Sequence, residues 1–367
     1  MKEMRKIFFI LLAGLLALAA CDDNGKDGPS EGKSARIYLE IFTGSLGGYY
    51  IYDSDGKLIF ECPKGYGITQ LTGEGKNWYG VLQSNSDSIY RILKNGKVVI
   101  STPNEIMGLA VENGDIYTLQ WDKEPNFNSI DHYTARIFKN ERQLYEYDSE
   151  ELFIYGLSVD HGDLIARAYY NGHYGTPTYW LNGKIYSLPI HVGSDFTPIA
   201  EIVKNGKDTL AVIDEYVYSQ SPYWWMNGEA HQLPQDFGLN IGIGSRYPRP
   251  KIAIAGGVSY MAGYRCSTIV LMVGGQEYPL DVPAGNMIIK VQRHGNDVYT
   301  LTCSNQTKYP PNGNTRIFKG TELVEIDGRA YIKDARYPGD GSAVFYQGGD
   351  TVNLSEFSVY DFVVLNK

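Results

Sequence analysis

Long helical patterns, basic patches and paired cysteines are all scarce in this sequence of 367 residues. No stretch of useful length repeats its apolar residues with a helical period, and no alternation of strands with helices indicates a parallel sheet. With 33 Lys and Arg against 42 Asp and Glu, the net charge is −9. Because phosphate binding needs a basic surface, we expect no nucleic acid among the partners.

Cysteine occurs only 4 times. Cys21 follows an apolar leader, and Cys62, Cys266 and Cys303 form an odd set that allows at most one disulfide. An oxidising compartment permits a bridge from Cys266 to Cys303, whereas a large core favours buried free thiols.

Sequence patterns of catalysis and cofactor binding are also missing. The 6 His residues show no metal-ligand spacing such as H-E-x-x-H, and neither a nucleophile elbow nor a P-loop occurs. Residues 53–56 (DSDG) are similar to the start of a calcium loop, but its twelfth position holds Lys64 in place of Glu. We therefore expect no metal, no cofactor and no catalytic residue, and the sequence favours a binding role over an enzymatic one.

The N-terminus has the layout of a secretory signal: basic residues, an apolar run over residues 7–18 and small residues at its end. Residues 18–21 (LAAC) resemble the bacterial lipobox, which implies cleavage before Cys21 and lipid, including palmitate, on that cysteine. A transmembrane anchor is the alternative, but the run is shorter than the roughly 20 residues that a spanning helix needs.

Residues 21–34 are polar and rich in charge and glycine, so we interpret them as a flexible tether. Without residues 1–20, which carry a net charge of +2, the mature chain has a charge of about −11. The pair Asp22-Asp23 is similar both to an inner-membrane retention signal of enterobacteria and to the acidic surface-export signal of Bacteroidetes lipoproteins. We expect a lipid-anchored protein of the cell envelope and outer membrane, and its periplasmic or surface orientation stays open.

A repeated hairpin organises residues 35–367, which we expect to be a single domain. Its turn residues, at positions 56, 96, 141, 183, 228, 275 and 320, are 40 to 47 residues apart, which is the period of a propeller blade. Asn-Gly, Asp-Gly and Gly-Gly supply the positive φ of a type I′ turn. Asn140-Glu141 departs from this rule, and a different turn is the alternative there.

A second series of glycine-centred turns lies between these hairpins, at Gly75, Gly114, Gly162, Gly206, Gly257, Gly295 and Gly341. Two tight turns in each period mean four strands in each period. The sequence therefore predicts an all-β fold, a β-propeller of four-stranded blades. We expect seven blades, with eight as the alternative, and a ring closed by the N-terminal and C-terminal strands together.

The hairpins YWLNG at Tyr179 and YWWMNG at Tyr223 resemble those of uncharacterised propeller-like lipoproteins from Bacteroidetes. The resemblance implies the architecture and does not identify an activity.

In such a blade the longer B–C and D–A connections share one end, where function tends to lie. Aromatic rings in these connections suit sugars and peptides, although they also cover loop backbone. The candidate contact residues are Trp121, Tyr169, Tyr170, His173, Tyr174, Tyr247 and Tyr309. By contrast, Trp180, Trp224 and Trp225 lie in predicted C strands, where packing between blades explains them better.

Three functions fit the sequence. The first is a monomeric, non-enzymatic binding or scaffold lipoprotein that contacts a glycan, a peptide or an envelope protein. The second is a glycoside hydrolase or lyase that uses two carboxylates about 5–10 Å apart. The third is a subunit of an outer-membrane assembly, which a large exposed apolar patch would favour.

Overall fold

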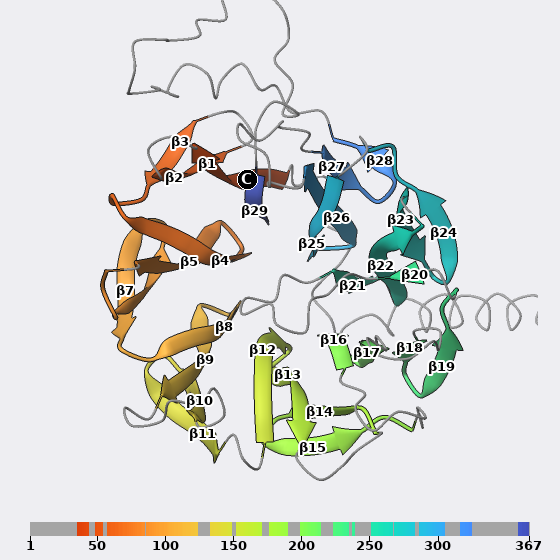
Figure 1. Cartoon of the computed structure of the whole chain (residues 1–367), viewed down its shortest axis with the longest axis horizontal. Coiled ribbons are helices and arrows are strands. Elements are labelled where there is room, and N and C mark those ends of the chain that lie inside the picture. Colours follow the sequence, from red (N-terminus) through yellow and green to blue (C-terminus); the bar gives the residue numbers. More distant parts are fainter. Residues whose placement is uncertain are drawn as a thin grey trace, which may run out of the picture. The chain divides into compact units, whose positions relative to one another are not determined.

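The computed structural model of the chain describes residues 35–43, 48–53, 57–84, 86–123, 133–148, 152–170, 176–189, 199–213, 223–234, 237–238, 251–266, 268–282, 286–304, 316–324 and 359–366. Every regular element in these ranges is a β-strand. The strands form seven antiparallel sheets, arranged as the blades of a seven-bladed propeller (Figure 1). The predicted all-β propeller and its seven blades are confirmed, and the alternative of eight blades is wrong.

The strands of the first three blades run as follows from the inner to the outer strand (Figure 1). Blade 1 contains β29 (Val359–Asn366), β1 (Ala35–Thr43), β2 (Gly48–Asp53) and β3 (Leu58–Glu61). Blade 2 contains β4 (Tyr66–Glu74), β5 (Asn77–Ser84), β6 (Tyr90–Lys94) and β7 (Lys97–Thr102). Blade 3 contains β8 (Glu105–Glu112), β9 (Asp115–Lys123), β10 (Tyr133–Lys139) and β11 (Arg142–Asp148).

The other four blades follow the same order. Blade 4 contains β12 (Leu152–Asp160), β13 (Asp163–Tyr170), β14 (Thr178–Leu181) and β15 (Lys184–Ser187). Blade 5 contains β16 (Ile199–Asn205), β17 (Asp208–Ile213), β18 (Tyr223–Met226) and β19 (Glu229–Gln232). Blade 6 contains β20 (Phe237–Gly238) and β21 (Ile252–Ala255), then β22 (Val258–Arg265), β23 (Thr268–Val273) and β24 (Gln276–Pro279). Blade 7 contains β25 (Asn286–His294), β26 (Asp297–Ser304), β27 (Arg316–Lys319) and β28 (Glu322–Leu323).

Blade 6 differs from the other blades. The short strand β20 follows β19 and pairs with β22, as β21 does further along. The inner strand of blade 6 is thus divided into two segments. The phenylalanine of β20, Phe237, is buried against β22, which explains why this short segment joins the sheet.

The core is divided among the interfaces between blades. Seven clusters of buried apolar side chains are present among the described residues, and each joins two neighbouring blades. Between blades 3 and 4, for example, Leu119 and Ile137 pack with Ile154 and Trp180. Burial decreases outwards: the first six residues of β8 are buried, whereas all four residues of β15 are exposed. This gradient is expected where each sheet packs on both faces near the axis of the ring.

An asparagine clamp fixes the C–D turn of blade 4 to the start of strand B. The Asn182 side chain accepts a hydrogen bond from the Leu164 N–H (2.8 Å) and donates one to Asp163 (2.7 Å). Its φ of 48°, followed by 86° at Gly183, is that of a type I′ turn. The same clamp is built by Asn95, Asn140 and Asn227 in blades 2, 3 and 5.

The turn at Asn140-Glu141 also adopts this conformation. Both residues have positive φ, 47° and 69°, so the alternative of a different turn is wrong. The Asn140 side chain accepts a hydrogen bond from the Ile116 N–H and donates one to Asp115, and these bonds accompany the left-handed conformation of the glutamate.

A β-bulge interrupts the inner strand of most blades. The pairing register shifts at Thr69, Met107, Gly156, Ala200 and Ile289. Bulges disrupt the ladder, and the backbone groups around them need other partners. Side chains of neighbouring blades supply them: Gln70 donates to the Ile106 carbonyl (3.0 Å), and Arg167 donates to the Ala200 carbonyl.

The ring closes where β1 pairs with the C-terminal strand β29, as predicted. The buried Lys290 ammonium of blade 7 donates to Phe362 of β29 (2.9 Å) and to Leu71 of blade 2 (2.6 Å), so one cation joins three blades. On the other side of β29, a methyl group at Gly73 would approach Leu365 and Val363 to within 2.3 Å and 2.7 Å. Only a glycine allows blade 2 to approach β29 this closely.

The asparagine clamp predicts an order of stability. Asn182→Gly keeps the left-handed turn but loses both side-chain hydrogen bonds, and should cost about 1–2 kcal/mol of unfolding free energy. Asn182→Ala should cost about 1 kcal/mol more, because alanine is strained at positive φ. Urea unfolding of the wild type and both variants checks this order, and a glycine variant as stable as the wild type would contradict the clamp.

Candidate functional site

The two ends of the ring differ in their connections. A–B and C–D turns share one end, which we call the turn end, and B–C and D–A connections share the other, the loop end. At the turn end the strands are joined by tight turns with positive φ. At the loop end several connections are longer, such as residues 124–132 after β9 and residues 214–222 after β17, whereas two residues each join β7 to β8 and β22 to β23.

Trp121 lies within strand β9, so its predicted position in a loop is wrong. Its half-buried ring stacks on Tyr133, with centroids 4.0 Å apart, and its Nε1 donates to the Ile154 carbonyl (3.2 Å). The tryptophan therefore packs blade 3 against blade 4. The polar residues around Trp121 did not indicate that its ring packs between two blades, because the partner strands are remote in the sequence.

The other candidate contact residues fall at or beyond strand ends. Tyr169 and Tyr170 are the last residues of β13 and pair with Phe153 and Leu152 of β12, so their predicted position in a loop is also wrong. Tyr169 is half-buried. The remaining contact candidates lie outside the described residues; they are His173, Tyr174, Tyr247 and Tyr309. The lipidation candidate Cys21 also lies outside them.

The tryptophans of the C strands pack between blades, as predicted. Trp180 is fully buried between blades 3 and 4, and its Nε1 donates to the Tyr147 hydroxyl (2.9 Å). Trp224 is buried between blades 5 and 6, and Trp225 is half-buried between blades 4 and 5.

An aromatic cluster marks the loop end of blades 3 and 4. Phe153 makes edge contacts with Trp121 (5.2 Å between ring centroids), with Tyr133 (5.3 Å) and with Tyr155 (5.4 Å). The chain of rings thus runs from the middle of blade 3 to the inner strand of blade 4. Sequence reasoning missed Phe153 and Tyr155 because they alternate along β12 like ordinary strand residues.

A buried polar group follows the aromatic cluster on the inner wall of the ring. The Arg167 guanidinium lies 4.2 Å from the centroid of the Tyr155 ring and bonds to the Ala200 carbonyl of blade 5. Next along β16, the Glu201 carboxylate accepts the Lys251 backbone N–H (2.8 Å). Arg167 and Glu201 are only 6% and 7% exposed. We refer to these two residues with Tyr155 as the Arg167–Glu201 group.

Burial changes the acidity of this carboxyl. It raises the pKa of Glu201 from 4.5 to about 7, against the smaller opposing effects of the Lys251 N–H and the Arg167 charge. A carboxyl of this pKa exists in both protonation states near neutral pH, so it both accepts and donates hydrogen bonds. The sequence around it, IAEIVKN, gave no sign of this because the burial comes from the neighbouring blades.

At the turn end, a cation crosses the ring. Arg293 of blade 7 contacts Asp160 of blade 4 (3.3 Å) and bonds to Asn205 of blade 5, although these blades are not neighbours of blade 7. His161 lies 2.9 Å from Asp160, and this hydrogen bond raises the pKa of the histidine. These contacts join opposite sides of the ring at its centre.

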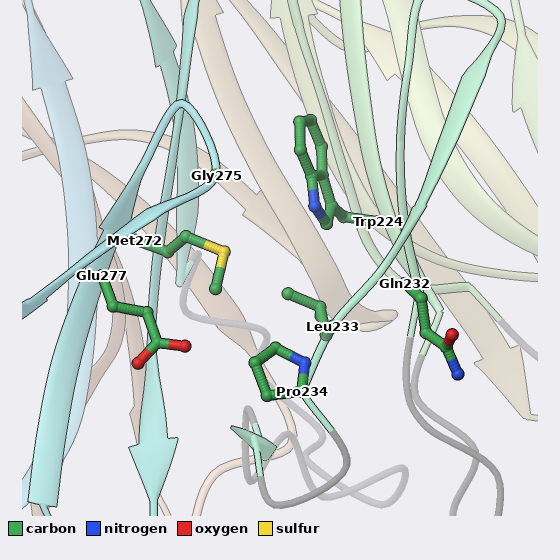
Figure 2. A pocket seen from close by; sticks show the side chains of 7 residues that line it. All are labelled: Trp224, Gln232, Leu233, Pro234, Met272, Gly275 and Glu277. Carbon is green, nitrogen blue, oxygen red and sulfur yellow. The ribbon is translucent and has the colours of Figure 1, made fainter.

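A hollow of about 480 Å³ lies between blades 5 and 6 (Figure 2). Figure 2 shows Met272 of blade 6 extending towards Leu233 of blade 5, below the indole of Trp224. His231 stacks on Trp224 at 4.2 Å, which covers one face of the indole. The acidic group of the hollow, Glu277, is paired with Arg265. The hollow therefore has a mixed polar and apolar lining, and its charged group already has a partner.

Neither a metal site nor a membrane span is found in the described part of the chain. No three His, Cys, Asp or Glu side chains among these residues gather in a way that would hold a metal ion. In the same ranges, no helix is long and apolar enough to cross a membrane.

Comparison with known proteins gives the fold. No family model matches the sequence, and no curated protein matches it. Among solved structures, the acylaminoacyl peptidase of Pyrococcus horikoshii matches with a TM-score of 0.50 and 13% identity, over 80% of this chain and 50% of that chain. The chain thus spans half the length of that peptidase.

Two further solved structures match with lower scores. The β-propeller domain of the Trilobed protease from Pyrococcus furiosus has a TM-score of 0.48 and 12% identity, over 79% of this chain and 90% of that domain. AztD of Citrobacter koseri has a TM-score of 0.44 and 8% identity, over 90% and 97% of the two chains. At these identities the likeness concerns the β-propeller fold alone.

The raised pKa of Glu201 predicts how stability depends on pH. Between pH 4.5 and about 7 the folded chain holds this proton more tightly than the unfolded chain does, so the unfolding free energy falls as pH rises through that range. Glu201→Gln, neutral at every pH, should be more stable than the wild type by about 3 kcal/mol at pH 8 and equal to it at pH 4. Urea unfolding at both pH values measures the difference, and a difference that does not change with pH would contradict the assignment.

Proposed function

We propose that this protein is a lipid-anchored envelope protein whose propeller is a non-enzymatic binding or scaffold module. The observation that carries the proposal is the contrast between a ring closed by the pairing of β1 with β29 and a loop end where several connections, such as those after β9 and β17, are long. Rigid scaffolds that present variable connections at one end are suited to binding. Its proposed location is the outer membrane, on the periplasmic side or at the cell surface.

The proposed anchor depends on Cys21. The signal-like residues 1–20, the lipobox LAAC and the polar residues 22–34 support cleavage and acylation at this cysteine. Several acyl chains on one residue give stable membrane attachment, which a single chain does not. The propeller then needs no membrane-binding surface of its own.

Lipidation is tested by Cys21→Ser. In cells given labelled palmitate, the wild type should incorporate the label and sediment with membranes, whereas the variant should remain unlabelled because serine lacks the thiol that accepts the lipid. Cys62→Ser is the matched control, since this buried cysteine belongs to the propeller, and it should label like the wild type. Incorporation of label into the Cys21 variant would contradict the proposed anchor. So would a lack of label in both the Cys21 and the Cys62 variant.

The proposed binding surface is the loop end of blades 3 and 4. The aromatic cluster there holds the ends of β9 and β12 in place, and Tyr169 and Tyr170 end the adjacent strand β13. Flat rings with polar edges bind sugars and peptides alike. The candidate ligand is accordingly a glycan, a peptide or an envelope protein.

A glycan array and a polysaccharide pull-down with the chain from Ser34 onwards test this surface. Tyr170→Ala should weaken binding at least about tenfold, as expected for a central aromatic contact. Tyr186→Ala is the matched control, because it removes a tyrosine that is 40% exposed on the outer strand β15. Trp121 is kept, since its loss would also disturb the packing of blades 3 and 4. Equal effects of the two variants would exclude the loop end as the binding surface, and a chain that binds no glycan would leave a protein partner.

A further inference from the structure

The guanidinium of Arg167 has more hydrogen-bonding capacity than its surroundings use. It carries five N–H donors, yet its bond to Ala200 is its only hydrogen bond among the described contacts. None of its other nitrogens is among the fully buried polar atoms that lack a partner, so they remain in contact with solvent-accessible space. A side chain that is 94% buried, as its 6% exposure implies, thus offers free donors at the inner wall of the ring.

The neighbouring tyrosine determines which side of the guanidinium stays available. The Tyr155 ring covers a face of the group at 4.2 Å, and its hydroxyl is fixed by a bond to the Ile199 carbonyl (3.3 Å). A guanidinium donates in its plane, so a ring stacked on its face leaves the donor edge open. This is the arrangement in which arginine binds a carboxylate with two parallel hydrogen bonds.

Glu201 supplies the second half of the arrangement. It follows Ala200 directly, no ion pair joins it to Arg167 among the described contacts, and it bonds to the Lys251 N–H (2.8 Å). The charged groups that act on its carboxyl are Arg167 of β13 and Lys251 before β21, with Tyr155 packed against the arginine. In its protonated form this carboxyl is a hydrogen-bond donor beside a cation.

We propose that the inner wall between blades 4 and 5 is a binding site for a carboxylate ligand, with Arg167 as the anion receptor and protonated Glu201 as a second donor. The inference rests on the proposed binding role and names a ligand class for it. The ligand carboxylate pairs with the free edge of the guanidinium. A neutral Glu201 next to it removes the repulsion between two carboxylates and bonds to the ligand.

The charge balance favours a carboxylate over a phosphate. One guanidinium neutralises one negative charge, and a second charge in this nearly buried place would carry a large desolvation cost. Binding also favours the protonated form of Glu201, whose pKa is about 7 in the free protein. The affinity should therefore be about tenfold higher at pH 6 than at pH 8, with proton uptake on binding.

Sodium acetate and the uncharged acetamide, which has nearly the same shape, are the probes. The ¹⁵N–¹H signal of the Arg167 Nε group is identified by its loss in Arg167→Lys, and sodium chloride of equal concentration controls for ionic strength. Acetate should shift this signal with a saturating curve, about tenfold more tightly at pH 6 than at pH 8, whereas acetamide should leave it unchanged. No shift with acetate, or an equal shift with acetamide, would overturn the proposal.

The Glu201→Gln variant tests the second donor separately. Glutamine keeps the shape and stays neutral, so acetate should still shift the Arg167 signal and its affinity should no longer change between pH 6 and pH 8. A variant that keeps the pH dependence of the wild type would exclude Glu201. Since the glycan screen monitors Tyr170 at the strand end and this titration monitors Arg167, failure of the carboxylate site is distinct from failure of the proposed binding surface.

Discussion

Antiparallel pairing between β1 and β29 closes a ring whose other six blades are each made from one continuous part of the chain. Every interface between blades needs a neighbour on both sides, so loss of this pairing would expose apolar surface on blades 2 and 7. The contacts around β29 are accordingly close: Gly73 lies against its side chains, and Lys290 bonds to its backbone. A buried ammonium is stable there because carbonyl groups on two blades accept its hydrogen bonds.

The inner strands connect this closure to the chemistry of the wall. Strands that converge on an axis need bulges, and bulges leave backbone groups that the ladder does not pair. Gln70 and Arg167 reach from one blade to such groups on the next, and Lys290 reaches from blade 7 to carbonyl groups on blades 1 and 2. The distances between blades therefore explain why these three side chains are long and polar. Arg167 differs because its one hydrogen bond among the described residues uses a fraction of its donors, and the proposed ligand would bind the remainder.

The sequence predicted what local chemistry determines. Tight turns recur every 40 to 47 residues, and the same asparagines that set the turn conformation also bind the start of strand B, so fold and blade number follow from the repeat. The sequence did not predict how side chains pack between strands that are remote in the chain. Trp121 lies in a polar segment that looks like the start of a loop, yet Tyr133 and Phe153 hold it within a sheet interface. Glu201 alternates along its strand like a solvent-facing residue, and only the neighbouring blades bury it.

The two ends of the ring suggest the direction from which its inner wall is reached. At the turn end, Arg293 links blade 7 to Asp160 of blade 4 and Asn205 of blade 5 across the ring. Glu201 is the third residue of β16, counted from the loop end, and Tyr155 is the fourth of β12. A small anion that reaches the Arg167–Glu201 group therefore has its shorter path from the loop end, past the aromatic cluster. A larger ligand would then contact the strand ends with its body and the Arg167–Glu201 group with its carboxylate. The two contacts would form one continuous surface.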